Sequence, residues 1–157
     1  MNHDILGLPS FSVIGLEANG PTASCFDWVP KLWAKTLPRA KELEGMKIEG
    51  CWGLMSDSET FLAPWKEQGR YLAGWQVPRE TEPFSDWKVW TLPASAWLRI
   101  QLRLDQYDEA FSFMTQEFFP NNPWVANGAC HEFYPNDFCN PKTDLLYCCV
   151  PIAPNPG

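Results

Sequence analysis

The sequence predicts an α+β fold made of two tandem strand-helix-strand-strand modules with pseudo-twofold symmetry. Strand-like segments rich in β-branched and aromatic residues alternate with two long amphipathic helical patterns, and the order of these elements occurs twice. The two modules also end alike, with LAGWQVP at residues 72–78 and LLYCCVP at residues 145–151. We therefore expect a largely antiparallel sheet with two helices on one face and a cleft at the joint.

The first module is expected at about residues 9–78, and it begins with a strand at residues 10–17. The helix that follows has apolar residues every three or four positions: Val29, Leu32, Trp33, Leu37, Ala40 and Leu43. Pro30 fits only the first turn, so the regular helix should begin close to it. Pro38 should kink the helix or end its first segment, and Gly45 is a suitable C-terminal stop.

Two strands complete this module, at residues 48–55 and 70–77. Gly74 in the second of them indicates a bulge or a close approach to the backbone. An acidic, proline-containing connector at residues 79–86 leads to residues 87–92, which are apolar but few.

The second module is expected at about residues 87–152. Its first strand, residues 94–103, alternates clearly between apolar and polar or aromatic positions. A helix ending near Pro120 follows, and its apolar face consists of Tyr107, Ala110, Phe111, Met114 and Phe118. Two further strands are predicted at residues 130–135 and 145–152.

Length and composition favour one globular domain over residues 1–157. Aromatic residues make up 15% of the chain, with 9 Trp, 10 Phe and 4 Tyr, so some rings can line a cavity as well as fill the core. The net charge of −7 argues against direct nucleic acid binding, which requires clustered Lys and Arg. The negative net charge is compatible with attraction of a cationic ligand or of a basic protein partner.

No apolar run reaches the roughly 20 residues of a membrane-spanning helix, and the N-terminus lacks the features of a signal peptide. We therefore expect a cytoplasmic protein with no membrane association. The six cysteines include no C-x-x-C pair, and there are only two histidines. This pattern predicts reduced, structural cysteines, no metal site and no cofactor.

The candidate functional residue is Glu132 in the strand-like sequence HEFY at residues 131–134. By itself, this carboxylate is either a solvated strand residue or the polar anchor of an apolar pocket. Alternation along the strand places Tyr134 on the side of Glu132, with His131 and Phe133 opposite. A carboxylate walled by rings loses hydration, which raises its pKa and prepares it to pair with a cation or to take a proton.

The pattern resembles the GyrI-like family, also called the AraC-type effector-binding domain, over roughly residues 9–152. The resemblance is carried by motifs in both modules: Val13-Ile14-Gly15, Leu32-Trp33 with Pro38-Arg39, Tyr71-x-Ala73-Gly74-x-x-Val77, residues 91–97 (TLPASAW), His131-Glu132-Phe133-Tyr134 and Val150-Pro151-Ile152. The tryptophan-rich loops depart from the proteobacterial-type gyrase inhibitor of this family.

The resemblance implies a central pocket for small, often cationic and aromatic molecules, as in the drug-sensing, multidrug-binding members. It assigns the polar contact at the pocket floor to Glu132. The chain is similar to the stand-alone members, which lack a DNA-binding domain. Some of those bind DNA gyrase, and others hydrolyse cyclopropane-bearing genotoxins.

The candidate ligand-binding residues are Glu132 and a set of aromatic residues that can surround it: Trp33, Trp52, Tyr71, Trp75, Trp97, Tyr107, Phe111, Tyr134 and Tyr147. Each ring is either a core residue or a wall of the pocket. Tyr147 is expected in a strand beside or near that of Glu132, where its phenol could orient the carboxylate.

Three hypotheses follow. The first is a stand-alone binding protein for hydrophobic, cationic or electrophilic small molecules, anchored by Glu132. The second is a hydrolase in which Glu132 acts as general base and Tyr134, Tyr147 or Tyr71 donates a proton to the leaving group. The third is a protein whose acidic surface contacts DNA gyrase.

Overall fold

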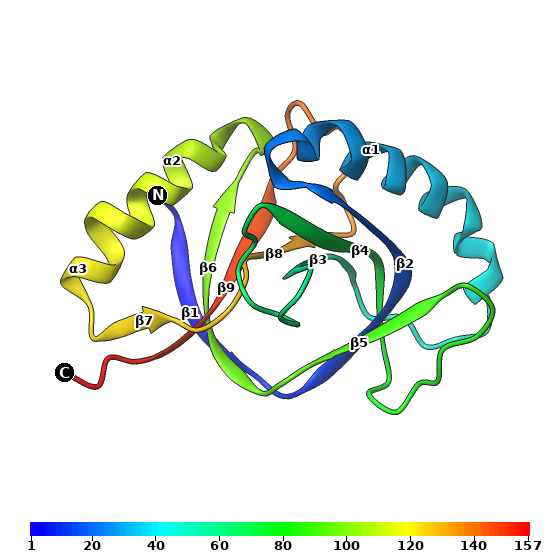
Figure 1. Cartoon of the computed structure of the whole chain (residues 1–157), viewed down its shortest axis with the longest axis horizontal. Coiled ribbons are helices and arrows are strands. Elements are labelled where there is room, and N and C mark those ends of the chain that lie inside the picture. Colours follow the sequence, from blue (N-terminus) through cyan, green and yellow to red (C-terminus); the bar gives the residue numbers. More distant parts are fainter.

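The computed structural model describes all 157 residues as a nine-stranded antiparallel sheet with helices on one face (Figure 1). The strands are β1 (His3–Leu8), β2 (Phe11–Pro21), β3 (Cys51–Asp57), β4 (Gln68–Val77), β5 (Lys88–Leu92), β6 (Ser95–Leu102), β7 (Trp124–Ala126), β8 (His131–Tyr134) and β9 (Leu146–Pro154). Helix α1 (Cys25–Thr36) continues as a 3-10 helix (Leu37–Leu43), and α2 (Tyr107–Phe113) continues through a π turn (Met114–Phe118) into α3 (Phe119–Asn121). Short 3-10 turns, Thr22–Ser24 and Leu104–Gln106, precede α1 and α2.

The sheet confirms the predicted duplication. Its strand order is β1-β6-β9-β8-β3-β4-β2-β5, with β7 paired to β9. The module β2-α1-β3-β4 on one side corresponds to β6-α2-β8-β9 on the other, and the β3–β8 pair joins them. This central pair contains Gly53 opposite Glu132, so the candidate carboxylate lies at the pseudo-twofold joint.

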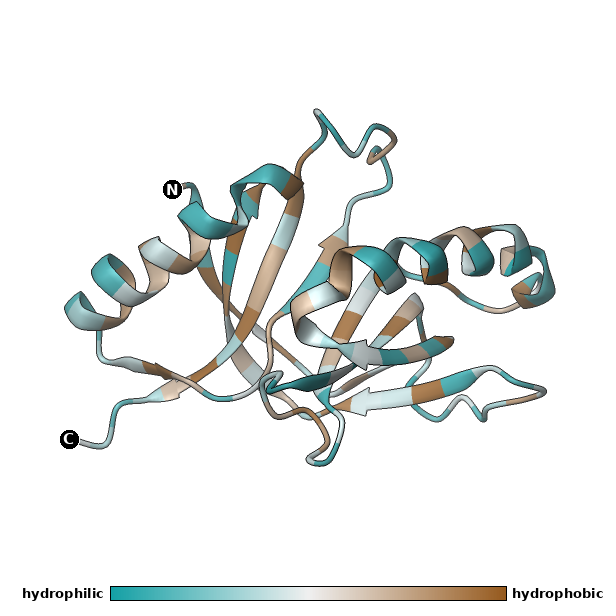
Figure 2. Ribbon diagram, turned by 45° about the horizontal axis from the view of Figure 1, so that its top comes forward, coloured by the Kyte–Doolittle hydropathy of each residue, from teal (hydrophilic) through white to brown (hydrophobic).

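Two of the three core clusters lie between a helix and the sheet. One packs α1 onto β2 and β4 through residues such as Leu32, Ile14 and Tyr71, and the other packs α2 and the π turn onto β6 and β9. Figure 2 shows the matching alternation of hydrophobic and hydrophilic residues along both helices. Each helix therefore holds its own half of the sheet.

The third core cluster fills the opposite face of the sheet and contains no helical residue. Its members include Phe11, Trp52, Trp90 and Trp97. Figure 1 shows the reason: the sheet curls, with the helices on its outer side, so its own edge strands close over this face. Aromatic rings are large enough to fill the space inside such a curl.

Three strands were absent from the sequence prediction. β1 pairs with β6 at the sheet edge, where most of its side chains are exposed, so it does not show the alternation of a half-buried strand. β5, in the segment predicted to be only a short apolar run, pairs with β2 and forms the opposite edge of the sheet. β7 has only three residues, too few for a recognisable pattern.

The helix boundaries also differ from the prediction. α1 begins at Cys25, so Pro30 lies in its second turn and removes one backbone donor there. The α-helical geometry ends at Thr36, before Pro38, and the chain turns at Gly45 with φ of 89°. The second helix contains a π turn, a feature without a sequence signature here. No helix has the combination of length and apolar character needed to cross a membrane.

Candidate functional site

Glu132 is a buried carboxylate held by three phenols. Its side chain projects from the central strand β8 toward the helices, and the residue is only 5% exposed. Tyr71 donates a hydrogen bond of 2.5 Å to Oε1, Tyr134 donates one of 3.1 Å to the same oxygen, and Tyr107 donates one of 2.5 Å to Oε2. The two bonds of 2.5 Å, from Tyr71 and Tyr107, have the length typical of a phenol that donates to an ionised acceptor.

The three phenols come from both modules. Tyr71 lies in β4 of the first module, whereas Tyr134 in β8 and Tyr107 at the start of α2 belong to the second. Trp33 of α1 extends the network, because its indole N–H donates to the Tyr71 oxygen at 3.0 Å. Both helices and the central strands therefore converge on one carboxylate.

Gly53 makes room for this network. It lies opposite Glu132 in the β3–β8 pair. A Cβ at this position would lie 1.8 Å from the Tyr71 oxygen and 3.0 Å from Glu132 Oε1. Only glycine leaves space for the phenol to reach the carboxylate. The sequence analysis missed this residue, although a glycine inside a strand can signal such a close approach.

Gly74 has a corresponding role in the neighbouring strand, as expected from its sequence context. A Cβ there would meet the backbone of Ile14 in β2 at 1.9 Å. The group that approaches Gly74 is thus another strand.

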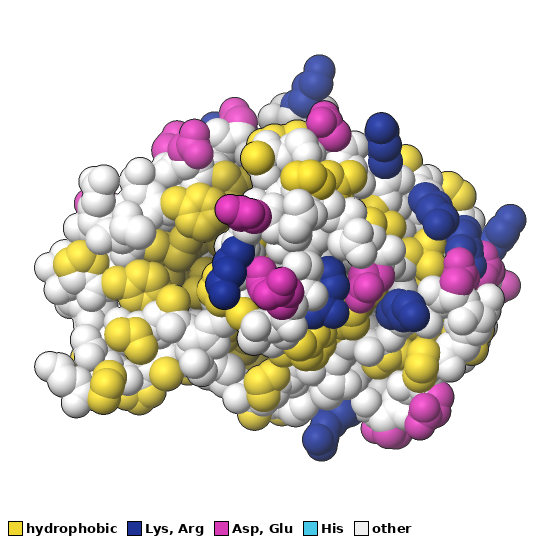
Figure 3. All heavy atoms as spheres, viewed as in Figure 1, with side chains coloured by type: hydrophobic (Ala, Val, Ile, Leu, Met, Phe, Trp, Pro, Cys, Tyr) yellow, Lys and Arg dark blue, Asp and Glu magenta, His cyan; other side chains and the backbone are white.

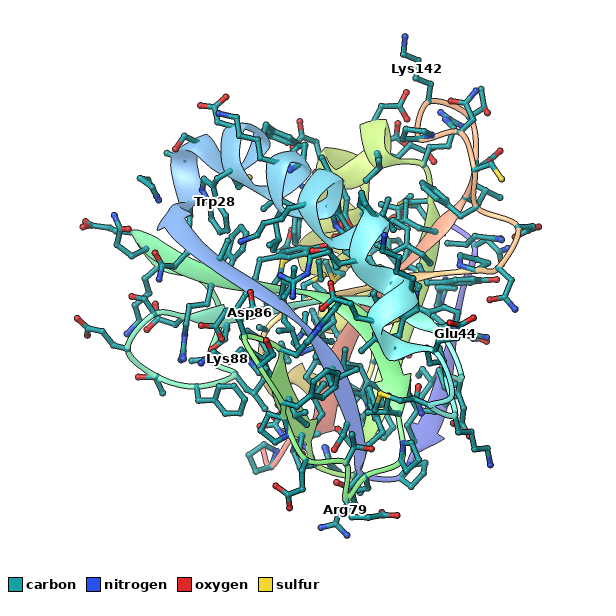
Figure 4. The ribbon with its side chains drawn as sticks, turned by 90° about the vertical axis from the view of Figure 1, so that its right-hand side faces the viewer. Trp28, Glu44, Arg79, Asp86, Lys88 and Lys142 are labelled. Atoms are coloured by element: carbon teal, nitrogen blue, oxygen red, sulfur yellow. The ribbon has the colours of Figure 1, made fainter.

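No basic side chain neutralises Glu132. The five ion pairs of the protein all lie elsewhere and include partly exposed groups. Figure 4 shows charged side chains such as Arg79, Glu44 and Lys142 at the periphery of the molecule. Burial raises the pKa of Glu132 above its ordinary value, and the hydrogen bonds from Tyr107, Tyr71 and Tyr134 lower that pKa part of the way back.

The phenols remain hydrogen-bond donors over a wide pH range. Burial, followed by the negative charge of Glu132, raises the pKa of Tyr71, Tyr107 and Tyr134 well above 10. Burial also raises the pKa of the nearby Cys51 thiol to about 12. The site can therefore offer neutral hydroxyl donors and a carboxylate, but no thiolate nucleophile from Cys51.

His131 faces away from Glu132, as the alternation of the strand predicts. It is 1% exposed, and its Nδ1 accepts a hydrogen bond of 3.0 Å from the backbone N–H of Met55. Burial lowers its pKa to about 3. His131 is therefore a satisfied structural residue and not a surface group.

Two other candidates lie on the helix side of the sheet without contacting the carboxylate through a hydrogen bond. Trp75 shares the face of Tyr71 and is half-buried against the core under α1. Phe111 is 47% exposed on α2, with its ring centroid 6.0 Å from that of Tyr107.

The structure separates Trp52, Trp97 and Tyr147 from Glu132. All three side chains lie on the opposite face of the sheet. Tyr147 pairs with Phe133, the neighbour of Glu132 that points away, and its hydroxyl accepts a hydrogen bond from Gln101 at 3.4 Å. The expected contact between Tyr147 and Glu132 is thus absent, and Tyr107 of α2 provides a phenol in its place.

The surface above the second module is hollowed. In Figure 3, hydrophobic side chains gather in a depression next to α2 and α3, whereas charged side chains are more frequent over the α1 half. A hollowed apolar surface of this kind is typical of a site that binds another molecule.

The duplicated fold and the phenol-bound carboxylate define a small-molecule-binding domain. The sequence model of the GyrI-like small molecule binding domain family matches residues 1–153. The chain belongs to this family, as its motifs indicated. No protein of curated function matches the chain in sequence.

Three solved structures have the same fold at low sequence identity. A putative bacterial transcription regulation protein from Staphylococcus aureus MU50 is 14% identical, with a TM-score of 0.67 over 97% of this chain and 98% of that one. The protein SAV2435, solved bound to tetraphenylphosphonium, is 12% identical, with a TM-score of 0.66 over 98% and 94%. A hydrolase from Listeria innocua is 10% identical, with a TM-score of 0.57 over 96% and 91%.

Proposed function

We propose that this protein binds hydrophobic cations, with Glu132 as the anionic anchor. The observation that carries the proposal is a buried carboxylate with three phenol donors and no basic side chain in contact. A charge buried without a counterion is unfavourable, and burial accordingly raises the pKa of Glu132. A ligand cation can supply the missing positive charge.

The aromatic surroundings favour a large, weakly hydrated cation over a small hydrated one. The Trp33 ring centroid lies 5.3 Å from that of Tyr134 and 6.2 Å from that of Tyr71, so the carboxylate is flanked by π faces and edges. Cation–π contacts contribute about 0.5–2 kcal/mol each when desolvated. Tetraphenylphosphonium in the structure of SAV2435, which shares this fold, is a ligand of this class.

Ligand access is expected from the side of Tyr107 and Tyr134. Both rings are partly exposed, whereas Tyr71 is completely buried. Tyr107 stands at the start of α2, beside the exposed ring of Phe111. A shift of the start of α2 would uncover Glu132 without disturbing the sheet.

The proposal is tested by calorimetric titration with tetraphenylphosphonium. Glu132→Gln should weaken binding at least tenfold at neutral pH, because the amide cannot compensate the cation. Glu117→Gln, which changes an exposed glutamate in the π turn, is the matched control and should bind as the wild type does. A neutral compound of similar shape, triphenylphosphine oxide, should not distinguish the wild type from Glu132→Gln. Equal affinity of Glu132→Gln and wild type for the cation would refute the anchor role.

A second candidate function is hydrolysis of strained electrophiles, including cyclopropane-bearing compounds. It is favoured by the pairing of a carboxylate of raised pKa with phenols that keep their protons. As general base, Glu132 would take a proton from water while the water oxygen attacks the ring carbon, and Tyr134, Tyr71 or Tyr107 would donate a proton to the leaving group. Mass spectrometry should then detect a product heavier by one water, formed by the wild type and not by Glu132→Gln.

Contact with DNA gyrase and a cytoplasmic location stay predictions. The gyrase contact depends on the family resemblance and on the net charge of −7. A salt-sensitive pull-down with gyrase that survives Glu132→Gln would support an interaction separate from the pocket.

A further inference from the structure

A second aromatic cavity lies on the face of the sheet opposite Glu132. Its volume is about 260 Å³, and its walls include Phe11, Trp52, Trp97 and Phe133. We propose that this cavity is a second ligand site, for a one-ring or two-ring aromatic ammonium compound. The proposal is independent of the function assigned to Glu132.

The sheet itself separates the two sites. Trp52 and Phe133 are adjacent in sequence to Gly53 and Glu132, and these neighbours point to opposite faces. Leu6 of β1 closes another side of the cavity, since it pairs with Trp97 on the same face. A ligand here would be separated from the phenols around Glu132 by the β3–β8 backbone.

The cavity walls are held in place before any ligand binds. The Trp52 ring centroid lies 4.9 Å from that of Phe133 and 5.0 Å from that of Phe11, so the rings support one another. The Trp52 indole N–H donates to the Gln76 side-chain oxygen at 3.1 Å. A preorganised aromatic wall reduces the entropy lost when a flat molecule binds.

The charge at the rim favours a cation. The Gln76 amide donates to a Glu49 carboxylate oxygen at 3.3 Å, which directs this carboxylate toward the cavity lining. Its other neighbour is the Lys47 ammonium, 3.9 Å away, and both side chains are more than half exposed. Arg99 also borders the cavity, but two hydrogen bonds of 2.9 and 2.6 Å to Asp4 balance its charge. Glu49 is therefore the least compensated charge at the rim.

The ligand class follows from these observations together. The cavity is slightly smaller than the roughly 300–1,000 Å³ of sites for drug-sized ligands, so it suits one or two rings. The aromatic walls select a flat ring, and Glu49 selects an ammonium group. Tyramine has both features, whereas 4-ethylphenol has the ring and lacks the ammonium group.

The test is calorimetric titration of the full chain with these two probes. Wild type should bind tyramine at least threefold more tightly than 4-ethylphenol. Leu6→Phe should fill the cavity and weaken tyramine binding at least tenfold. Ile5→Phe is the matched control, because Ile5 is exposed and points to the other face of β1, and it should bind normally. Glu49→Gln keeps the shape of an exposed residue and should weaken tyramine binding without changing that of 4-ethylphenol.

The outcomes also separate this site from the one at Glu132. Leu6→Phe should leave tetraphenylphosphonium binding unchanged, and Glu132→Gln should leave tyramine binding unchanged. Absence of tyramine binding at millimolar concentration would overturn the proposal. It would also be overturned by unchanged binding in both Leu6→Phe and Glu49→Gln, or by loss of tyramine binding in Glu132→Gln alone.

Discussion

Gly53 and Tyr71 share one small space in the centre of the sheet. The phenol oxygen of Tyr71 lies where a Cβ on residue 53 would be, at a separation of only 1.8 Å. Because this same oxygen donates to Glu132, the absence of a side chain at one position determines the hydrogen bonding at another.

Gly53→Ala should therefore displace the Tyr71 phenol from Glu132. We expect a loss of about 1–3 kcal/mol in the free energy of unfolding, because a buried carboxylate loses a donor. Urea denaturation measures this loss. Gly7→Ala is the control, since a Cβ at position 7 of β1 meets no atom within 4 Å. Equal stability of the two variants would contradict the assigned role of Gly53.

Tyr107→Phe should affect the site, and Tyr147→Phe should not. The first change leaves Glu132 Oε2 without its phenol donor, whereas Tyr147 lies on the other face of the sheet. Loss of a donor to the ionised form raises the pKa of Glu132 further. The pH midpoint of tetraphenylphosphonium binding should thus move upward in Tyr107→Phe only. A shift of similar size in Tyr147→Phe would mean that the observed phenol network does not control Glu132.

Glu132 should make the protein less stable as the pH rises from 4.5 through the raised pKa of its carboxyl in the folded protein. Its pKa is about 4.5 in a solvated chain and is raised in the folded protein, so the native state binds more protons between these two values. The free energy of unfolding therefore decreases with rising pH in that window, by at most about 1.4 kcal/mol per pH unit. Glu132→Gln should remove this dependence. The comparison requires urea denaturation at several pH values above 4.5, and an unchanged slope would exclude the titration of Glu132 as its cause.

His131 should make the protein less stable as the pH falls, which is opposite to the effect of Glu132. Its pKa falls from 6.5 to about 3 on folding, so the unfolded chain binds more protons between these values. Stability therefore falls as the pH is lowered from 6.5 toward 3, again by at most about 1.4 kcal/mol per pH unit. His131→Asn preserves an acceptor for the Met55 N–H but cannot titrate, and it should flatten the acid limb of the stability curve. Persistence of the full acid slope in this variant would show that another group is responsible.

The sequence by itself determined the local features of the site. Alternation in residues 131–134 was sufficient to place Glu132 and Tyr134 on one face and His131 on the other, because the strand period of two is a local property of the backbone. The repeated order of elements was sufficient to predict the duplicated fold, and the sequence motifs were sufficient to predict membership of the GyrI-like family.

Only the tertiary structure decided which distant residues meet. Tyr107 and Tyr147 were both candidates near Glu132, yet strand register directs Tyr147 to the opposite face, and the packing of α2 brings Tyr107 within 2.5 Å. Register also places Trp52 and Trp97 in a separate aromatic cavity. Periodicity specifies which residues of one element share a face, whereas partners from different elements depend on pairings over many tens of residues.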